Sequence, residues 1–283
     1  MKSKPIRLMF LLVGGFLTAC SPSAEQLYEK ANAYFAKDQF EEAIPLYEQL
    51  QLKDANNSSA LAKLTISYSF IQQWKKCSET GELAFERKMD LMELYLRVGD
   101  CYEHQNQPKK ALKTYQEGIK RYPDQMDLKE KAAPLFFAEG QYSAAVDYFK
   151  ILTVAYPERE DFLLNIGYAL DRQKKYTEAE TYFNKVLAIN SQDSSAFYGL
   201  AMIYEHQNQI PKAISFYQQT LKWHPTHLSA LYNLAQIYEQ NNQKSEAVKT
   251  WKNYIQTAKG KPNQKAFLAK AEAQLKKLQG GAS

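Results

Sequence analysis

The chain has 283 residues, of which 45% are hydrophobic and 24% are charged, so its composition is that of a globular protein and not of a disordered one. The formal net charge is +5, but three of the 36 basic residues, Lys2, Lys4 and Arg7, lie at the amino terminus. Without them, 36 − 3 = 33 basic residues stand against 31 acidic ones. This near balance gives no general argument for nucleic-acid binding, and we predict no nucleic-acid partner.

The first nineteen residues have the pattern of a secretory signal peptide, with a basic start, an apolar run from Leu8 to Leu17 and small residues after it. Ten helical residues rise about 15 Å, whereas a bilayer core is about 30 Å thick, so this run is too short to span a membrane. The run ends in Leu17-Thr18-Ala19-Cys20, which resembles a bacterial lipobox. The resemblance implies cleavage before Cys20 and lipidation at Cys20, where several acyl chains would form a stable anchor. The alternative is an ordinary cleaved signal peptide.

Ser21 follows the expected lipidation site, where Asp would retain an enterobacterial lipoprotein at the inner membrane. The resemblance therefore favours the periplasmic face of the outer membrane. We expect removal of residues 1–19 and a short lipid-anchored linker over residues 20–23. Ser23 and Gln26 form a capping-box pattern, which predicts that ordered helix begins at Ala24.

One pattern recurs every 34 residues from Ala24 to Lys261 without insertion or deletion. The twentieth residue is Ala in six of the seven copies, the eighth is small or nearly so, and the eleventh and the twenty-fourth are each aromatic in six. The clearest copy runs from Ser194 to His227, with a turn at Gln207-Asn208-Gln209. Its pattern residues are Phe197, Leu200, Ala201, Tyr204, Ala213, Tyr217 and Pro225. These residues and their spacing resemble the tetratricopeptide repeat (TPR).

The resemblance implies an all-α fold, a right-handed α-solenoid of seven TPR helix pairs, in which each pair buries its apolar face against its neighbours. Beyond the last repeat, Pro262-Asn263 interrupts the helix, and apolar residues then recur at helical spacing. We therefore expect a capping helix and a tail over residues 262–283. The predicted repeats are 24–57, 58–91, 92–125, 126–159, 160–193, 194–227 and 228–261.

The second repeat departs most from the pattern, because Thr65, Cys77 and Gly81 replace a small residue, an alanine and an aromatic residue. Its contacts with neighbouring repeats should be looser. Cys77 and Cys101 lie on helices that pack together in this family, and the periplasm is oxidising, so these two residues are a candidate disulfide pair. Closing a loop of about 25 residues would contribute roughly 3 kcal/mol. The alternative is a pair of buried thiols. Pro134 predicts a kink in the first helix of the fourth repeat.

The sequence contains no phosphate-binding loop, nucleophile elbow, zinc-protease motif or paired-cysteine metal spacing. We therefore predict a protein that is not an enzyme and has no cofactor or metal. His224 and His227 lie in one loop. A solvated turn is the simpler interpretation, and a pair of metal ligands is the alternative. His104 and His206 occupy equivalent places in two identical five-residue segments, which indicates a shared turn structure.

The resemblance also implies that the first helix of each repeat lines a concave groove, chiefly through its second, fifth, ninth, twelfth and thirteenth residues. The fifth residues form a mostly apolar strip, and several twelfth residues are acidic. Such a surface suits an extended or helical peptide with apolar anchors and Lys or Arg, although the acidic face is alternatively just solvated. The candidate groove residues are Tyr28, Leu96, Glu103, Leu164, Tyr168, Asp171, Tyr198, Met202, Glu205, Tyr232, Gln236 and Glu239.

These features predict a non-catalytic scaffold lipoprotein that binds a peptide or protein partner for the assembly of envelope complexes. Narrower alternatives are a pilotin-like factor for secretins of type IV pili and a regulatory adaptor of peptidoglycan-processing enzymes. An envelope enzyme or its regulatory subunit, and a self-associating structural protein, are rivals from other classes. From Lys249 onward there are eight lysines and one acidic residue, Glu272, so an anionic envelope component is a possible further contact.

Overall fold

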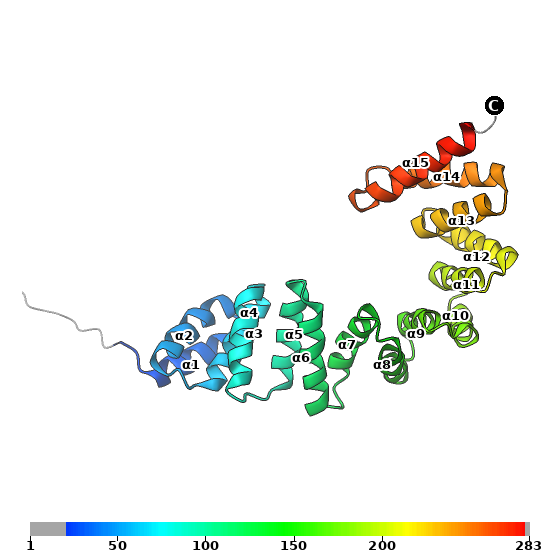
Figure 1. The fold of residues 1–283 in the computed structure, drawn as a ribbon. Coiled ribbons are helices and arrows are strands. Elements are labelled where there is room, and N and C mark those ends of the chain that lie inside the picture. The colour runs from blue at the N-terminus through cyan, green and yellow to red at the C-terminus, as the bar shows by residue number, and fades with distance from the viewer. Residues whose placement is uncertain (1–20, 281–283) are drawn as a thin grey trace, which may run out of the picture. The chain divides into compact units, whose positions relative to one another are not determined.

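The computed structural model describes residues 21–280, which form fifteen α-helices and one short 3-10 helix, with no strand among them. The predicted signal peptide and Cys20 lie outside the described residues, as does the end of the tail from residue 281. The prediction of an all-α solenoid of helix pairs is confirmed (Figure 1). No helix between residues 21 and 280 is long and apolar enough to cross a membrane.

Each predicted repeat contains two helices, and the first of them starts at the first residue of the repeat. The helices are α1 (Ala24–Phe35), α2 (Phe40–Lys53), α3 (Ser58–Phe70), α4 (Trp74–Glu86), α5 (Met92–His104), α6 (Pro108–Arg121), α7 (Met126–Ala138), α8 (Tyr142–Ala155), α9 (Glu160–Arg172), α10 (Tyr176–Ile189), α11 (Ser194–His206), α12 (Ile210–Trp223), α13 (Leu228–Gln240), α14 (Lys244–Ala258), η1 (Pro262–Gln264) and α15 (Lys265–Gly280).

Helix starts and turns follow from local chemistry. The Ser23 hydroxyl accepts a hydrogen bond from the Gln26 N–H at 3.1 Å, and the Gln26 side chain accepts from the Ser23 N–H at 2.9 Å, so the predicted capping box is present. Within every repeat, the N–H of the sixteenth residue bonds to the carbonyl of the eleventh. The fifteenth residue between them has a positive φ, as at Gly140 (74°), Lys174 (61°) and Asn208 (57°). This is the left-handed helix ending that glycine and asparagine adopt most readily.

The chain divides into two compact units, Met1–Cys101 and Tyr102–Ser283, with the division inside α5. The sequence did not predict this division. In the first unit, α1 packs on α2, α2 on α3 and α3 on α4. Their core combines small residues with long ones, so the helices approach closely around buried aromatic rings. It includes Leu27, Ala31, Ala43, Tyr47, Leu50, Leu64, Tyr68 and Cys77.

Cys77 on α4 and Cys101 on α5 form a disulfide, with their Cα atoms 6.2 Å apart and both residues fully buried. The contacts of the second repeat are close at this point and not loose as expected. A Cβ atom on Gly81 would lie 2.2 Å from Cγ2 of Val98 on α5. Because glycine replaces the usual aromatic residue, the backbone of α4 lies close to the Val98 side chain. Contact between this backbone and Val98 takes the place of the missing aromatic ring.

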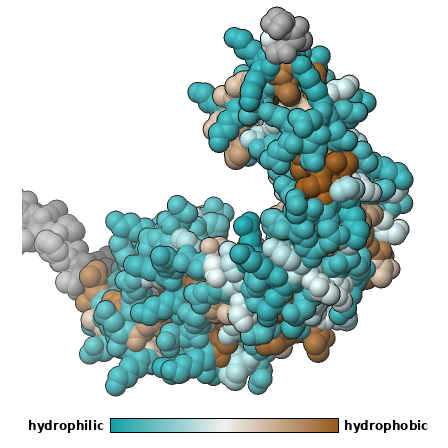
Figure 2. Space-filling view, turned by 45° about the vertical axis from the view of Figure 1, so that its right-hand side comes forward, coloured by the Kyte–Doolittle hydropathy of each residue, from teal (hydrophilic) through white to brown (hydrophobic). Residues whose placement is uncertain are grey.

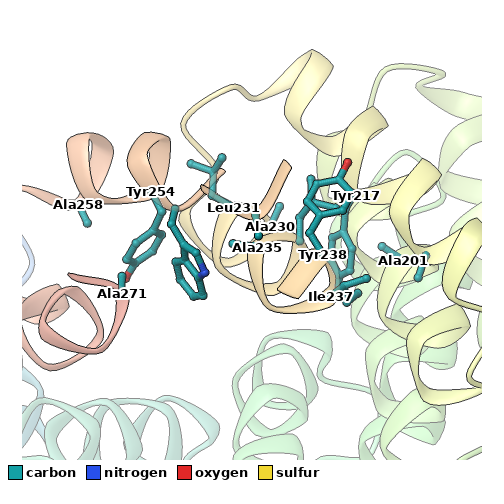
Figure 3. Packing of buried hydrophobic residues seen from close by; sticks show 14 of the residues in the cluster. Ala201, Tyr217, Ala230, Leu231, Ala235, Ile237, Tyr238, Tyr254, Ala258 and Ala271 are labelled. Atoms are coloured by element: carbon teal, nitrogen blue, oxygen red, sulfur yellow. The ribbon is translucent and has the colours of Figure 1, made fainter. Parts of the chain in front are cut away.

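In the second unit, α7, α9, α11 and α13 follow one another along the inner side of a curve, and their partner helices lie outside (Figure 1). Near its C-terminal end, large rings such as Tyr217 and Tyr254 fill the space between helices whose contact residues are alanines (Figure 3). Ala201, Ala213 and Ala235, at the eighth and twentieth repeat positions, are fully buried. Small residues at these positions therefore set the spacing of the helices.

The fourth repeat contains the helix in which a proline kink was predicted. α7 continues through Pro134, whose ring is exposed, so the proline does not end the helix. The predicted kink stays a prediction.

At the end of the second unit, α15 packs on α14 and buries Ala271, with Leu268, Leu275 and Leu278 against the same core. The predicted apolar face of this helix is therefore its contact with the last repeat.

Candidate partner-binding site

The candidate groove residues of the second unit lie on its inner helices. Leu164 and Tyr168 belong to α9, Tyr198, Met202 and Glu205 to α11, and Tyr232, Gln236 and Glu239 to α13. All eight are partly or fully exposed. Tyr28 on α1 and Leu96 on α5 belong to the first unit, whereas Glu103 lies at the end of α5 in the second unit. Ten of the twelve candidate residues therefore belong to the second unit.

One pocket of about 180 Å³ brings two of the predicted residues together. Tyr198 and Tyr232 line it, and the remaining lining residues come from α13, α14, η1 and α15. None of its lining residues carries a charged side chain. Figure 2 shows hydrophobic residues gathered at the level of α12 and α13 on a mostly hydrophilic surface. The lining residues that the sequence did not single out are Leu228, Ser229, Asn233, Tyr254, Gln264 and Phe267.

The ring of Tyr232 is the centre of an aromatic cluster in this pocket. Its centroid is 5.1 Å from that of Trp251, 5.3 Å from that of Tyr254 and 5.6 Å from that of Phe267. The interplanar angles are 83°, 70° and 85°, so all three contacts are edge-to-face, a favoured geometry for aromatic pairs. Phe267 is nevertheless 48% exposed. The cluster thus presents a rigid wall with one ring open to solvent.

A hydrogen-bond chain supports the other side of the pocket. The Tyr217 hydroxyl donates to Oε2 of Glu205 at 2.5 Å, and Nδ2 of Asn233 donates to the Tyr217 hydroxyl at 3.1 Å and to the Tyr198 hydroxyl at 3.3 Å. Because Tyr217 gives its proton to Glu205, its oxygen accepts from the asparagine. This fixes the amide orientation and leaves Oδ1 of Asn233 without a hydrogen-bond partner among residues 21–280. Burial, followed by the charge of Glu205, raises the pKa of Tyr217.

The predicted acidic row is only partly available to a partner. Asp171 is 4% exposed, and its Oδ1 lies 2.8 Å from Nδ1 of His206. This carboxylate therefore contacts another residue of the protein and is not available to a partner, contrary to the prediction. Glu103 accepts from the Tyr115 hydroxyl at 2.7 Å, as Glu205 does from Tyr217. In both repeats the tyrosine follows its glutamate by twelve residues, a spacing that makes this pairing visible in the sequence.

Glu239 differs from these carboxylates because Trp251 stands twelve residues after it and has no hydroxyl. Among residues 21–280, the Glu239 side chain has no hydrogen-bond or ion-pair partner. It is partly exposed on α13, as is its neighbour Gln236 one turn earlier. Glu239 is therefore the predicted carboxylate that is best placed to contact a partner.

In the first unit, the environment of Tyr28 is basic. Its hydroxyl lies 2.8 Å from Oγ of Ser59, and Nζ of Lys63 lies 5.3 Å from its ring centroid and 2.7 Å from Oδ1 of Asn32. The hydrogen bond with Ser59 is the main cause that lowers the pKa of Tyr28. Tyr28 therefore lies beside a lysine, whereas Tyr198 and Tyr232 line an uncharged pocket.

The sixth repeat position is the signal that the sequence reasoning missed. Lys63, Asn233 and Phe267 each come 35 residues after a tyrosine at the fifth position, and each lies beside that tyrosine in the structure. The sixth residue of one repeat thus determines what surrounds the fifth residue of the repeat before it. This rule is readable from the sequence once the repeat register is known.

His227 has a structural role at a helix start. The imidazole Nδ1 of His227 accepts from the Ala230 N–H at 3.1 Å, so His227 caps the start of α13. Burial is the main cause that lowers the pKa of His227, and His224, with its ring centroid 5.3 Å away, lowers it further. Within residues 21–280, no group of three or more His, Cys, Asp or Glu side chains is arranged to hold a metal ion.

Comparison with known families agrees with the repeat register. Three sequence profiles described as tetratricopeptide repeat match residues 24–56, 93–124 and 130–194. A profile described as anaphase-promoting complex, cyclosome, subunit 3 matches residues 172–254. No curated protein matches the chain.

Solved structures share the fold at low sequence identity. The C-terminal part of a TPR repeat-containing protein from Cytophaga hutchinsonii is 18% identical, with a TM-score of 0.60, and the alignment covers 83% of this chain and 97% of that one. A structure of MamA from MSR-1 is 16% identical, with a TM-score of 0.53 and coverage of 59% and 97%. Another MamA structure is 21% identical, with a TM-score of 0.50 and the same coverage. These likenesses show the fold alone.

Proposed function

Because the chain is a tetratricopeptide-repeat protein, and so a scaffold for protein interactions, we propose that it binds a peptide segment of a protein partner along α9, α11 and α13. We further propose that it does so as a lipoprotein at the periplasmic face of the outer membrane, where it helps to assemble envelope complexes. A pilotin-like role and a regulatory role toward peptidoglycan-processing enzymes would use the same mode of binding.

The observation that carries the binding proposal is the uncharged aromatic pocket between Tyr198 and Tyr232, with Glu239, which is unpaired among residues 21–280, on the same helix as Tyr232. Exposed aromatic side chains that are already held rigidly lose little entropy when a partner covers them, so they are effective anchors. The pocket favours a scaffold over an envelope enzyme. Its titratable groups with shifted pKa values are Tyr198 and Tyr254, and burial raises both, so they stay protonated at neutral pH and supply no general base.

The position of the first helix supports the membrane proposal. Its cap is Ser23 and its first residue is Ala24, so only Ser21 and Pro22 separate Cys20 from the ordered fold. Three extended residues reach about 10 Å, and a lipid on Cys20 would hold the first repeat close to the membrane surface. Metabolic labelling with a fatty acid, followed by membrane fractionation, tests this directly. Cys20→Ala should abolish both the label and the membrane association.

The binding proposal is tested by recovering partners from envelope extract with the full chain. The double variant Gln236→Arg/Glu239→Lys reverses the charge on α13 without removing a side-chain hydrogen bond or ion pair among residues 21–280, and Lys150→Glu on α8 is a charge change outside the proposed groove. We expect the first variant to lose the partners that the unaltered chain recovers and the second to keep them. Equal recovery by all three chains would contradict the groove assignment.

A further inference from the structure

The pocket beside Tyr232 has an uncharged lining and includes the exposed ring of Phe267. We propose that it is the anchor site for one tyrosine or tryptophan side chain of the partner peptide, with acidic residues next to that side chain. This inference rests on the proposed function, because it takes the partner segment to be a peptide lying along α11 and α13.

The volume limits the occupant to a single side chain. The pocket measures about 180 Å³. Pockets that enclose a drug-sized molecule usually measure about 300 Å³ or more. The pocket is therefore too small for a typical free cofactor and has room for one large side chain.

The lining selects an uncharged aromatic group. A Lys, Arg, Asp or Glu side chain would lose its hydration inside the pocket and find no opposite charge there. An aromatic ring, in contrast, would extend the edge-to-face cluster in which the Tyr232 ring meets those of Tyr254 and Phe267. Phe267 is 48% exposed, so the incoming ring would also remove apolar surface of this residue from water.

The polar groups of the pocket favour an aromatic side chain that carries a hydrogen-bond donor. Glu205, acting through Tyr217, orients Asn233 so that its Oδ1 is left as an acceptor. A tyrosine hydroxyl or an indole N–H satisfies this acceptor, whereas phenylalanine leaves it without a partner. Gln264 accepts from the Tyr254 hydroxyl through Oε1 at 3.0 Å, so this second amide is also oriented by the protein.

The surroundings of the pocket favour acidic neighbours in the peptide. Gln264, which lines the pocket, lies in the sequence between the exposed lysines Lys261 and Lys265. Positive charges at one rim of an uncharged pocket steer a complementary ligand and fix its direction. A peptide with Asp or Glu beside its Tyr or Trp therefore matches both the pocket and its rim.

The test uses the full chain and a displayed library of random short peptides. Phe267→Ala removes the open ring of the pocket, and Ser229→Trp fills the pocket from the exposed surface of α13. Phe70→Ala is the matched control, because Phe70 is 47% exposed and lies in the first unit. Circular dichroism melting curves establish that each variant is folded. The strongest selected peptide is then synthesised, and its binding is measured by fluorescence anisotropy.

We expect the unaltered chain and Phe70→Ala to enrich peptides with Tyr or Trp beside Asp or Glu. Phe267→Ala and Ser229→Trp should each bind the synthetic peptide at least about tenfold more weakly, as for an interface anchor. Replacing the peptide's aromatic residue by Ala should have a similar effect, and Phe should fall between them. Peptides that bind both pocket variants normally but lose binding to Gln236→Arg/Glu239→Lys would overturn the pocket and leave the groove. Enrichment of no peptide would overturn both.

Discussion

Removal of the disulfide between Cys77 and Cys101 should destabilise the first unit selectively. The bridge closes a loop of about 25 residues, since the two cysteines are 24 positions apart. The chain-entropy relation gives a stabilisation of about 3.5 kcal/mol for a loop of this length at 25 °C. Because α3 packs on α4, and α4 is joined to α5 by the bridge and by the contact of Gly81 with Val98, the loss should appear in α3 and α4.

Hydrogen exchange measured by mass spectrometry separates the two units. In Cys77→Ala/Cys101→Ala, amides of α3 and α4 that exchange by unfolding of the first unit should exchange a few hundred times faster, which is the fold-change equivalent to about 3.5 kcal/mol. Peptides from α9 to α13 should keep their rates and serve as the internal control. The unaltered chain after reduction has the same side chains without the bridge, so it separates the bridge from the packing of the sulfur atoms.

The reasoning would be refuted by unchanged exchange in α3 and α4 of both the double variant and the reduced chain. If only the double variant changes, the stabilisation comes from packing and not from the bridge. Non-reducing mass spectrometry of protein taken from the periplasm gives an independent check. Two free thiols there would show that the bridge does not form in the cell.

Three further predictions concern individual residues. Gly199→Ala should lower the free energy of unfolding, measured by urea titration, by about 0 to 2 kcal/mol. The new Cβ would lie 2.3 Å from the buried Phe183 ring, and better helix propensity offsets about 1 kcal/mol of the cost of this contact. A higher free energy of unfolding would contradict the close packing. Gly140→Ala should destabilise the fold by about 1 kcal/mol, and Lys174→Gly should stabilise it by about 0.5 to 1 kcal/mol. Both positions have positive φ, and a Cβ at Gly140 meets no other atom, so the backbone conformation alone decides the effect. Equal shifts of the melting temperature in both variants would refute this. Burial lowers the folded-state pKa of His227, so the unfolded chain binds the extra proton first, and stability present above pH 6.5 should be lost as the pH falls through the folded value. His227→Asn keeps a capping side chain and should flatten this part of the pH profile, and an unchanged profile would show that another group is responsible.

The repeat register could be predicted from the sequence alone because it depends on local and periodic features. Ser23 and Gln26 predicted the start of α1, and the spacing of small residues such as Ala201 and Ala213 predicted where paired helices touch. These signals repeat every 34 residues, so errors at one copy are corrected by the others. The helical period and the need to bury each apolar face then leave one arrangement of the helix pairs.

Only the tertiary structure decided which groove residues are free. Asp171 and Glu239 occupy the same repeat position, yet Asp171 is buried against His206, whereas Glu239 is partly exposed and unpaired among the described residues. The pocket likewise depends on Phe267, which reaches Tyr232 from the helix after the last repeat. Such contacts join side chains about one repeat apart, so they depend on the angle between neighbouring helix pairs and on side-chain rotamers. The repeat pattern alone specifies neither.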